Sequence, residues 1–239
     1  MDSGSTRTTS LRPANRVLET YTRLRELIVS GRVAPGTRII ESDISARLGV
    51  SRTPVRSALQ RLRQEGYVLA ARPGRQMRLT VAPMTREDAR EVFGILGEIE
   101  ALGARWAAEM TDEPRAELAA EMARLNEELA RTARRRPVDP GSVFDLHTRF
   151  HGCYMERVGA PRLLQLHESI KPQAERYRRL YSNLFAQESQ LSVEEHDGIV
   201  TAIAKGHPGA AQRAVELNWR NAADRLAESI DLMGERGSG

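Results

Sequence analysis

Two histidines stand four residues apart in the sequence HTRFH, at positions 147 and 151. On an α-helix this spacing places both imidazoles on one face, which is how a pair of metal ligands is arranged. The pattern resembles the HExxH motif of zinc proteases, but Thr148 stands where the motif has its general base. The pair therefore leaves three interpretations open: a metal site, a polar ligand pocket, or two ordinary core histidines.

The helices around this pair turn further polar side chains inward. His147 and His151 share the apolar face of a helix expected at 142–158, and His196 and Asn218 lie at the centres of apolar stripes on two later helices. Burying an unpaired polar group costs a few kcal/mol. We therefore expect these four side chains to converge on one another or on a ligand.

From residue 86 onward the sequence predicts helices and no strands. Thr85 and Asp88 form the S/T-x-x-E/D pattern that begins a helix. Glycines, prolines and polar loops separate the apolar stripes, so we expect a bundle of about six helices. The expected helices are residues 86–110, 112–134, 142–158, 161–186, 192–205 and 208–233.

The first 82 residues predict a different order: helix, helix, short turn, helix and two strands. The turn LGVS contains the expected glycine, and RPGR forms the tip between the strands. This is the order of a winged helix-turn-helix. The predicted fold is thus mostly α, with an N-terminal winged helix-turn-helix that has a two-stranded wing, followed by a C-terminal all-helical bundle.

In a helix-turn-helix the second helix enters the major groove of DNA and presents its first residues to base edges. Arginine suits this place because its guanidinium group can bind guanine or phosphate through two hydrogen bonds. A wing tip can reach the neighbouring DNA backbone. The residues expected to contact DNA are Ser51, Arg52, Thr53 and Arg56 in the helix, and Gly74 and Arg75 at the wing tip.

The distribution of charge supports a DNA-binding first part. Residues 1–82 hold 15 Arg, no Lys and 6 acidic residues, whereas the whole chain has a formal net charge of only +4. The remainder is therefore acidic. No apolar run has the length of a membrane span or a signal peptide, and the single cysteine excludes an internal disulfide. These features fit a cytoplasmic protein.

The sequence SDISARLGVSRTPVRSALQRLRQEGYV resembles the winged-helix domain of the GntR family of bacterial transcription regulators. The second part resembles the effector-binding (FCD) domain of the FadR subfamily, through the FH of HTRFH, through GAPRLL and through EHDGIVTAIAKGHPGAA. The resemblance covers about residues 15–232. It implies a homodimer that binds a palindromic operator on double-stranded DNA and responds to a small-molecule effector, with repression as the expected sign of regulation.

This resemblance divides the chain into four expected segments. Residues 1–14 are a disordered lead-in, residues 15–82 the DNA-binding domain, residues 83–88 a linker, and residues 89–234 the effector-binding and dimerisation domain.

The resemblance also refines the expected metal site. Metal-binding FCD domains have the pattern Asp-x-x-x-His on one helix, then two later histidines. Here His147 stands at the Asp position, His151 and His196 match, and Asn218 stands at the last His position. Three imidazoles suit a divalent metal such as zinc or nickel, but the family's carboxylate is missing. Asp145 lies about 160° round the helix from His147 and does not replace it. A metal site and a metal-free polar pocket both stay open.

The expected effector pocket departs from the family as well. Many members have an arginine four residues before the glutamate at position 100, where it can hold a carboxylate ligand, but this chain has Leu96. On the helix expected at 161–186, Gln173 and Tyr177 fall on the apolar stripe of Leu166, and Arg176 flanks it. Leu96, Glu100, Gln173, Arg176 and Tyr177 are thus the predicted pocket residues, although the last three fit a rim or an interface equally well.

Two other functions are weighed against an effector-controlled regulator. A metal-dependent enzyme with a DNA-binding tether needs a general base beside the histidines, but Thr148 cannot act as one and Glu195 points about 100° away from His196. A constitutive dimeric DNA-binding protein would have no use for buried polar groups in its bundle. The prediction is therefore a regulator and not an enzyme.

Overall fold

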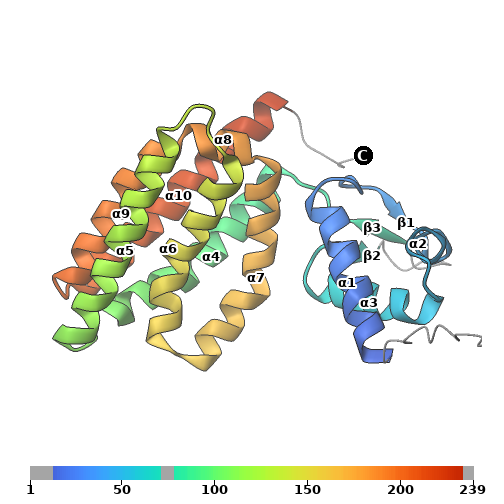
Figure 1. Cartoon of the computed structure of the whole chain (residues 1–239), viewed down its shortest axis with the longest axis horizontal. Helices are drawn as coiled ribbons and strands as arrows, with labels where there is room; N and C mark the ends of the chain where they lie inside the picture. Colours follow the sequence, from blue (N-terminus) through green and yellow to red (C-terminus); the bar gives the residue numbers. More distant parts are fainter. Residues whose placement is uncertain (1–12, 71–77, 234–239) are drawn as a thin grey trace, which may run out of the picture. The chain divides into compact units, whose positions relative to one another are not determined.

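A computed structural model of the chain describes residues 13–70 and 78–233. They form two compact units that meet in the sequence between Ala82 and Pro83, and each unit is considered by itself (Figure 1). Gly74 and Arg75, predicted at the wing tip, lie outside the described residues. None of the described helices combines the length and the apolar character that crossing a membrane requires.

The first unit contains a helix-turn-helix and a small sheet. Because Gly49 takes a positive φ of 66°, the chain can leave α2 sharply and begin α3 three residues later. Helix α1 begins at Pro13, inside the segment that the sequence assigned to a disordered lead-in. The elements are α1 (Pro13–Val29), β1 (Arg38–Ile39), α2 (Glu41–Leu48), α3 (Arg52–Gln64), β2 (Val68–Ala70) and β3 (Leu79–Val81).

Helices α1 and α3 pack on each other around a buried apolar core. Leu24, Val55 and Leu62 are fully buried in it. At the edge of the core, the Tyr21 hydroxyl donates a hydrogen bond to Glu65 at 2.7 Å, and the guanidinium of Arg61 lies 3.9 Å from the centre of the Tyr21 ring. These contacts fix the orientation of α3, the helix predicted to read DNA.

The sheet has three strands rather than the predicted two. Its order is β1-β3-β2, with antiparallel neighbours. Strand β1 pairs Arg38 with Thr80 and Ile39 with Leu79, in a segment for which the sequence predicted no strand. Two residues are too few to show the alternation of a strand, so this strand depends on its long-range partner and leaves no local signal.

The second unit is a helical bundle, drawn from green to red in Figure 1. Helix α4 packs along α10, and α5 packs against both α6 and α9. Thr85 caps α4 as predicted, because its hydroxyl oxygen accepts the N–H of Asp88 at 3.1 Å. The helices are α4 (Arg86–Ala108), α5 (Asp112–Ala133), α6 (Pro140–Val158), α7 (Pro161–Leu180), α8 (Ser182–Gln187), α9 (Ser189–Ala204) and α10 (Pro208–Met233).

The helix predicted at 161–186 is wrong in two respects. It breaks at Tyr181 into α7 and α8, where no glycine or proline in the sequence indicates a helix end. Its buried face is also different, because Leu166 is 57% exposed while Leu163, His167 and Ala174 are buried. The sequence pattern fits either face, and packing against α4 selects the one that carries His167.

The long helices α4 and α10 approach each other very closely at Gly97. A Cβ atom at this position would lie 2.8 Å from the Cβ atom of Trp219. The absence of a side chain at Gly97 therefore allows Trp219 to turn its indole into the centre of the bundle. There it contacts the polar cluster described next.

Candidate functional site

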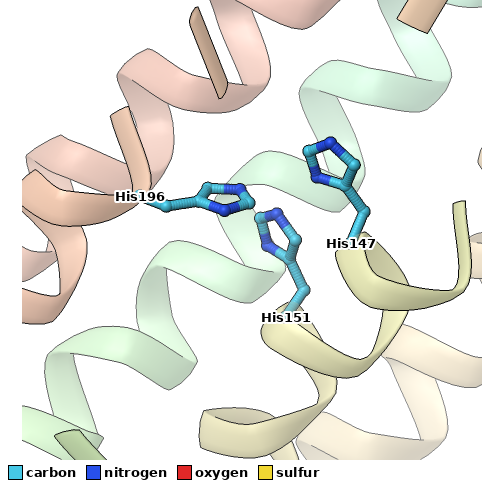
Figure 2. A group of neighbouring side chains, drawn as sticks. All are labelled: His147, His151 and His196. Carbon is cyan, nitrogen blue, oxygen red and sulfur yellow. The ribbon is translucent and has the colours of Figure 1, made fainter. Parts of the chain in front are cut away.

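Three histidines meet at the centre of the helical unit. Helix α6 contributes His147 and His151, and α9 contributes His196; their rings point toward a common centre (Figure 2). Their candidate ligand nitrogens all lie within 4.8 Å of one another, and the three residues are 5%, 6% and 0% exposed. The convergence expected from the apolar stripes is confirmed for these three residues.

The surroundings of His196 determine which nitrogen faces the centre. Its Nδ1 lies 3.1 Å from Oδ1 of Asn126. The Asn126 amide donates to the backbone carbonyl of Val193 and to Asp197, so its oxygen must face the imidazole. Nδ1 of His196 therefore carries the proton and donates it. Nε2 keeps a lone pair and is buried without a hydrogen-bond partner.

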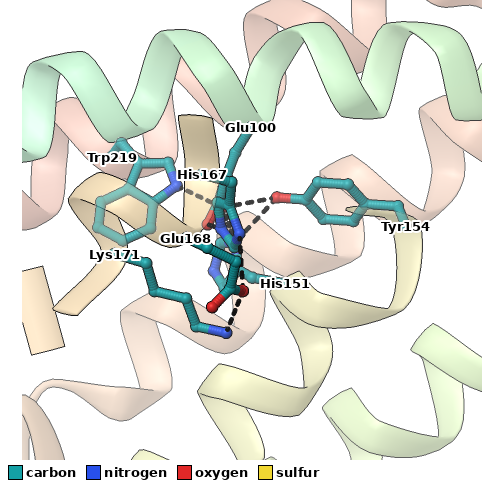
Figure 3. Close-up of polar contacts among 7 residues, drawn as sticks. All are labelled: Glu100, His151, Tyr154, His167, Glu168, Lys171 and Trp219. Atoms are coloured by element: carbon teal, nitrogen blue, oxygen red, sulfur yellow. Dashed lines mark hydrogen bonds and ion pairs between the residues drawn. The ribbon is translucent and has the colours of Figure 1, made fainter. Parts of the chain in front are cut away.

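His151 is held in a similar way, but by a carboxylate. Its Nδ1 lies 2.8 Å from Oε2 of Glu100. The same oxygen accepts hydrogen bonds from the Tyr154 hydroxyl at 2.9 Å and from the Trp219 indole at 2.8 Å. The other oxygen lies 2.9 Å from Nε2 of His167 (Figure 3). Glu100 thus joins α4, α6, α7 and α10.

Burial and nearby charge set the protonation of this cluster. Burial alone would raise the pKa of Glu100, but the charges and hydrogen bonds of His151 and His167 hold that pKa well below its usual range. Burial holds the pKa values of His147 and His196 well below the ordinary value, and the charge of Arg178 lowers them further. The result is an ionised carboxylate at Glu100 and neutral imidazoles at His147 and His196.

These features fit a divalent metal ion. Zinc binds neutral imidazole at 2.0–2.1 Å in tetrahedral geometry, which places two ligand nitrogens about 3.4 Å apart. The limit of 4.8 Å between the nitrogens allows this after small rotations of the rings. The unpartnered Nε2 of His196 supplies a buried lone pair that a metal would use. Zinc and nickel both accept such ligands.

Asn218, the fourth predicted ligand, lies beside the histidines with its amide nitrogen engaged. It lines a cavity of about 20 Å³ together with His147 and His151. Its Nδ2 donates to Glu195 at 2.6 Å, so Oδ1 is the atom left for a metal or a ligand. Glu195 also accepts hydrogen bonds from Asn221 and Arg225, and it so fixes the amide of Asn218.

Two further hollows lie beside this centre and share lining residues. Another cavity of about 20 Å³ shares His151, Arg178 and Trp219 with the cavity beside Asn218. A surface groove of about 510 Å³ over α5, α6 and α7 shares Thr148, Gly152 and Lys171 with that inner cavity. The groove is as large as many ligand sites, whereas each inner cavity has room for about one water molecule. The inner cavity that shares residues with the groove is lined by Leu96, Glu100, Thr148, His151, Gly152, His167, Lys171, Ala174, Glu175, Arg178 and Trp219.

The predicted effector residues are only partly found at these hollows. Leu96 and Glu100 line the inner cavity that shares residues with the groove. Gln173, Arg176 and Tyr177 are not among the residues that line the groove or the two inner cavities. The Tyr177 hydroxyl instead lies 2.7 Å from the Asp88 carboxylate and ties α7 to the start of α4.

The sequence interpretation missed the cations and the histidine of α7. His167, Lys171 and Arg178 line the cavity that Leu96 and Glu100 also line. The spacing of four between Leu163 and His167 was the available signal, but the apolar stripe of Leu166 concealed it. Glu100 was predicted as a pocket residue, but its contact with His151 was not, because Glu100 lies on α4, far from HTRFH in the sequence.

The residues predicted to contact DNA lie at the start of α3. Ser51, Arg52, Thr53 and Arg56 are all exposed there. The Ser51 hydroxyl makes no capping hydrogen bond. Arg56 pairs with Glu41 of α2 at 3.0 Å. Arg52 is exposed, and the described residues offer its guanidinium no ion-pair partner.

Comparison with known proteins identifies a family model for each of the two units. The model of the gntR family of bacterial regulatory proteins matches residues 16–76, and that of the FCD domain matches residues 91–221. An uncharacterised HTH-type transcriptional regulator of Bacillus subtilis, YdhC, is 22% identical over 92% of this chain and 95% of its own length. The HTH-type transcriptional repressor RspR of Escherichia coli is 27% identical over 92% of this chain and 93% of its own.

Solved structures share the fold. McbR/YncC of E. coli superposes with a TM-score of 0.64 at 19% identity, over 90% of this chain and 98% of its own. A GntR regulator from Rhodococcus sp. RHA1 also gives 0.64, at 23% identity, over 90% and 99% of the two chains. With family models matched over both units, the chain belongs to the gntR family of bacterial regulatory proteins and carries an FCD domain as its helical unit.

Proposed function

We propose that this transcriptional regulator controls its affinity for operator DNA through a small molecule bound in the helical unit, beside a divalent metal ion. The ion is zinc or nickel, held by His147, His151 and His196, with Oδ1 of Asn218 as a fourth, weaker ligand. The observation that carries the proposal is the buried three-histidine cluster inside an FCD domain, with the lone pair of His196 Nε2 unpartnered.

The DNA-binding part of the proposal rests on the exposed start of α3. Ser51, Arg52, Thr53 and Arg56 contact base edges and phosphates, and Gly74 and Arg75 extend the contact from the wing. Residues 15–82 act as the DNA-binding domain, and residues 89–234 bind the effector and form a homodimer. A dimer of winged helices requires a palindromic operator. Repression is the proposed sign because RspR and GlaR of E. coli are named repressors.

The lining of the inner cavity suggests the chemistry of the effector. Lys171 and Arg178 bring positive charge to a cavity that Glu100 and Glu175 also line, and Glu100 already accepts several hydrogen bonds. An effector with an acidic group matches these cations, although Leu96 replaces the arginine expected from the family. The effector would lie in the groove, with its acidic group directed toward the cavity past Thr148 and Gly152, which line both.

Regulation rather than catalysis is proposed for the metal centre. A hydrolytic metal enzyme needs a free general base near the bound water. The carboxylate beside the histidines, Glu100, is occupied by donors from Tyr154, Trp219, His151 and His167. It is therefore suited to holding side chains in place and not to accepting a substrate proton.

The test is the metal content of untagged protein purified without chelator. We expect close to one zinc or nickel ion per chain in the wild type, by elemental analysis. The variant His196→Ala should lose it, because it removes a ligand. His207→Ala, which removes an exposed histidine at the start of α10, should retain it. Folded wild-type protein without metal would contradict the metal centre and favour a pocket in which these side chains bind the effector directly.

A further inference from the structure

The direct ligands of the proposed metal centre carry no negative charge. Three neutral imidazoles and an amide leave both positive charges of a divalent ion uncompensated in a buried site. Arg178 adds a further positive charge, since it lines both inner cavities. A buried charge that is not balanced is costly. The stability of the site therefore requires an acidic group close to the ligands.

We infer that Glu100 is a positioning residue of the metal centre, which orients His151 and supplies, through its hydrogen bond, the negative charge that the ligands lack. The inference rests on the proposed metal site. Glu100 is 2% exposed, and its Oε2 lies 2.8 Å from Nδ1 of His151. A carboxylate on one nitrogen of a metal-binding histidine fixes the ring and makes the other nitrogen a stronger ligand.

The surroundings of Glu100 hold its carboxylate in one position. Tyr154 and Trp219 donate to the oxygen that contacts His151, and His167 contacts the other oxygen. These partners come from three different helices, as Figure 3 shows. The His151 ring therefore has a fixed acceptor at Nδ1 and presents Nε2 as its ligand atom.

His196 lies in the same site but is oriented by a neutral partner rather than by a carboxylate. Asn126 holds its Nδ1 with a neutral amide oxygen at 3.1 Å. Both rings thus have their Nδ1 engaged, but only His151 is paired with a carboxylate. The charge of Glu100 is therefore a contribution that can be removed while the geometry is kept.

The variant Glu100→Gln removes this charge with little change of shape. The amide oxygen can accept from His151, Tyr154 and Trp219. The amide nitrogen can donate to Nε2 of His167, because Nδ1 of His167 has no hydrogen-bond partner and can carry that ring's proton. Every partner stays satisfied, so the variant should fold, which thermal unfolding of metal-free protein would verify.

The matched control is Tyr154→Phe. It removes a hydroxyl that contacts both Glu100 and His151, with almost no loss of volume and no change of charge. If only the integrity of the hydrogen-bond network mattered, the two variants would behave alike. If the charge matters, only Glu100→Gln should weaken metal binding strongly.

The experiment measures the dissociation constant for Zn²⁺ by competition with a chromophoric chelator, and the proton position on His151 by nitrogen NMR of metal-free protein. We expect Glu100→Gln to bind Zn²⁺ about 10–100-fold more weakly than the wild type, with the proton still on Nδ1. Tyr154→Phe should stay within about threefold of the wild type.

The outcomes separate this inference from the proposed function. If the wild type binds neither Zn²⁺ nor Ni²⁺, the proposed metal centre and this inference are both overturned. If the wild type binds and Glu100→Gln binds equally well, only the role of Glu100 is overturned. An equal loss in Glu100→Gln and Tyr154→Phe would also overturn it, because the charge would then make no separate contribution.

Discussion

His151 and His196 each have one ring nitrogen engaged, and this arrangement defines the chemistry of the site. The partners are Glu100 and Asn126, which come from α4 and α5 and are distant from the histidines in sequence. Both imidazoles thereby keep Nε2 available for the proposed metal ion. The residues that determine the properties of the centre therefore include neighbours that no ligand motif contains.

At the residue scale we expect a pH dependence of the metal-free protein. Burial holds the pKa values of His147 and His196 well below that of an unfolded histidine, near 6.5. Below that pH the unfolded chain binds more protons than the folded chain, so the free energy of unfolding falls as the pH falls. Between pH 7.5 and 5.5 these two residues should together lower it by about 2–3 kcal/mol.

The variant His147→Asn isolates this effect from other titrating groups. It removes one of the two histidines, so its loss of stability between the two pH values should be smaller than that of the wild type by about 1 kcal/mol. Denaturant unfolding of chelator-treated protein at both pH values measures the difference. An identical pH dependence of the two proteins would mean that His147 is protonated in the folded state.

At the scale of elements, the close approach of α4 and α10 positions the centre. Glu100 lies on α4 and Trp219 on α10, and their hydrogen bond of 2.8 Å joins the two helices. Gly97 makes the approach possible, since a Cβ atom there would lie too close to Trp219. The glycine is thus a packing requirement of the site, one turn before the carboxylate that the site uses.

We expect Gly97→Ala to lower the free energy of unfolding by about 1–3 kcal/mol, because the new methyl group pushes α10 away from α4. Gly94→Ala is the matched control on the same helix. A Cβ atom at Gly94 meets nothing within 4 Å, so alanine should leave stability unchanged or raise it by about 0.5–1 kcal/mol. Denaturant unfolding compares the two variants, and equal stability would contradict the close packing described above.

At the scale of the whole molecule, the two units differ in charge, and this difference fits their different roles. The first 82 residues contain 15 Arg and 6 acidic residues, which favours contact with the phosphates of DNA. The helical unit has the buried polar centre and the groove. Each unit forms its own core.

We expect Arg52→Ala to weaken operator binding by about 1–3 kcal/mol, because an arginine at the start of a recognition helix contacts a base or a phosphate. Arg213→Ala, on the exposed face of α10, removes the same charge and should change the affinity far less. Fluorescence anisotropy at fixed salt, with DNA selected from a random pool by the wild type, measures both. Equal effects would show that Arg52 acts only through net charge.

The sequence alone was sufficient for the features with a strong local pattern. The helix-turn-helix, the predominance of helices after residue 86, the cap at Thr85 and the inward face of HTRFH all follow from periodicity and from residues that begin or end helices. Such signals arise within a few turns of chain, so they can be recognised in the sequence without knowledge of the fold.

Only the tertiary structure decided the rest. Strand β1 exists because β3 pairs with it, and the face of α7 that carries His167 is buried because the packing of α7 against α4 covers it. The contact between Glu100 and His151 joins residues from two helices whose separation in sequence hides their proximity. Hydrogen bonds of this kind depend on the packing of whole helices, and no local pattern encodes that packing.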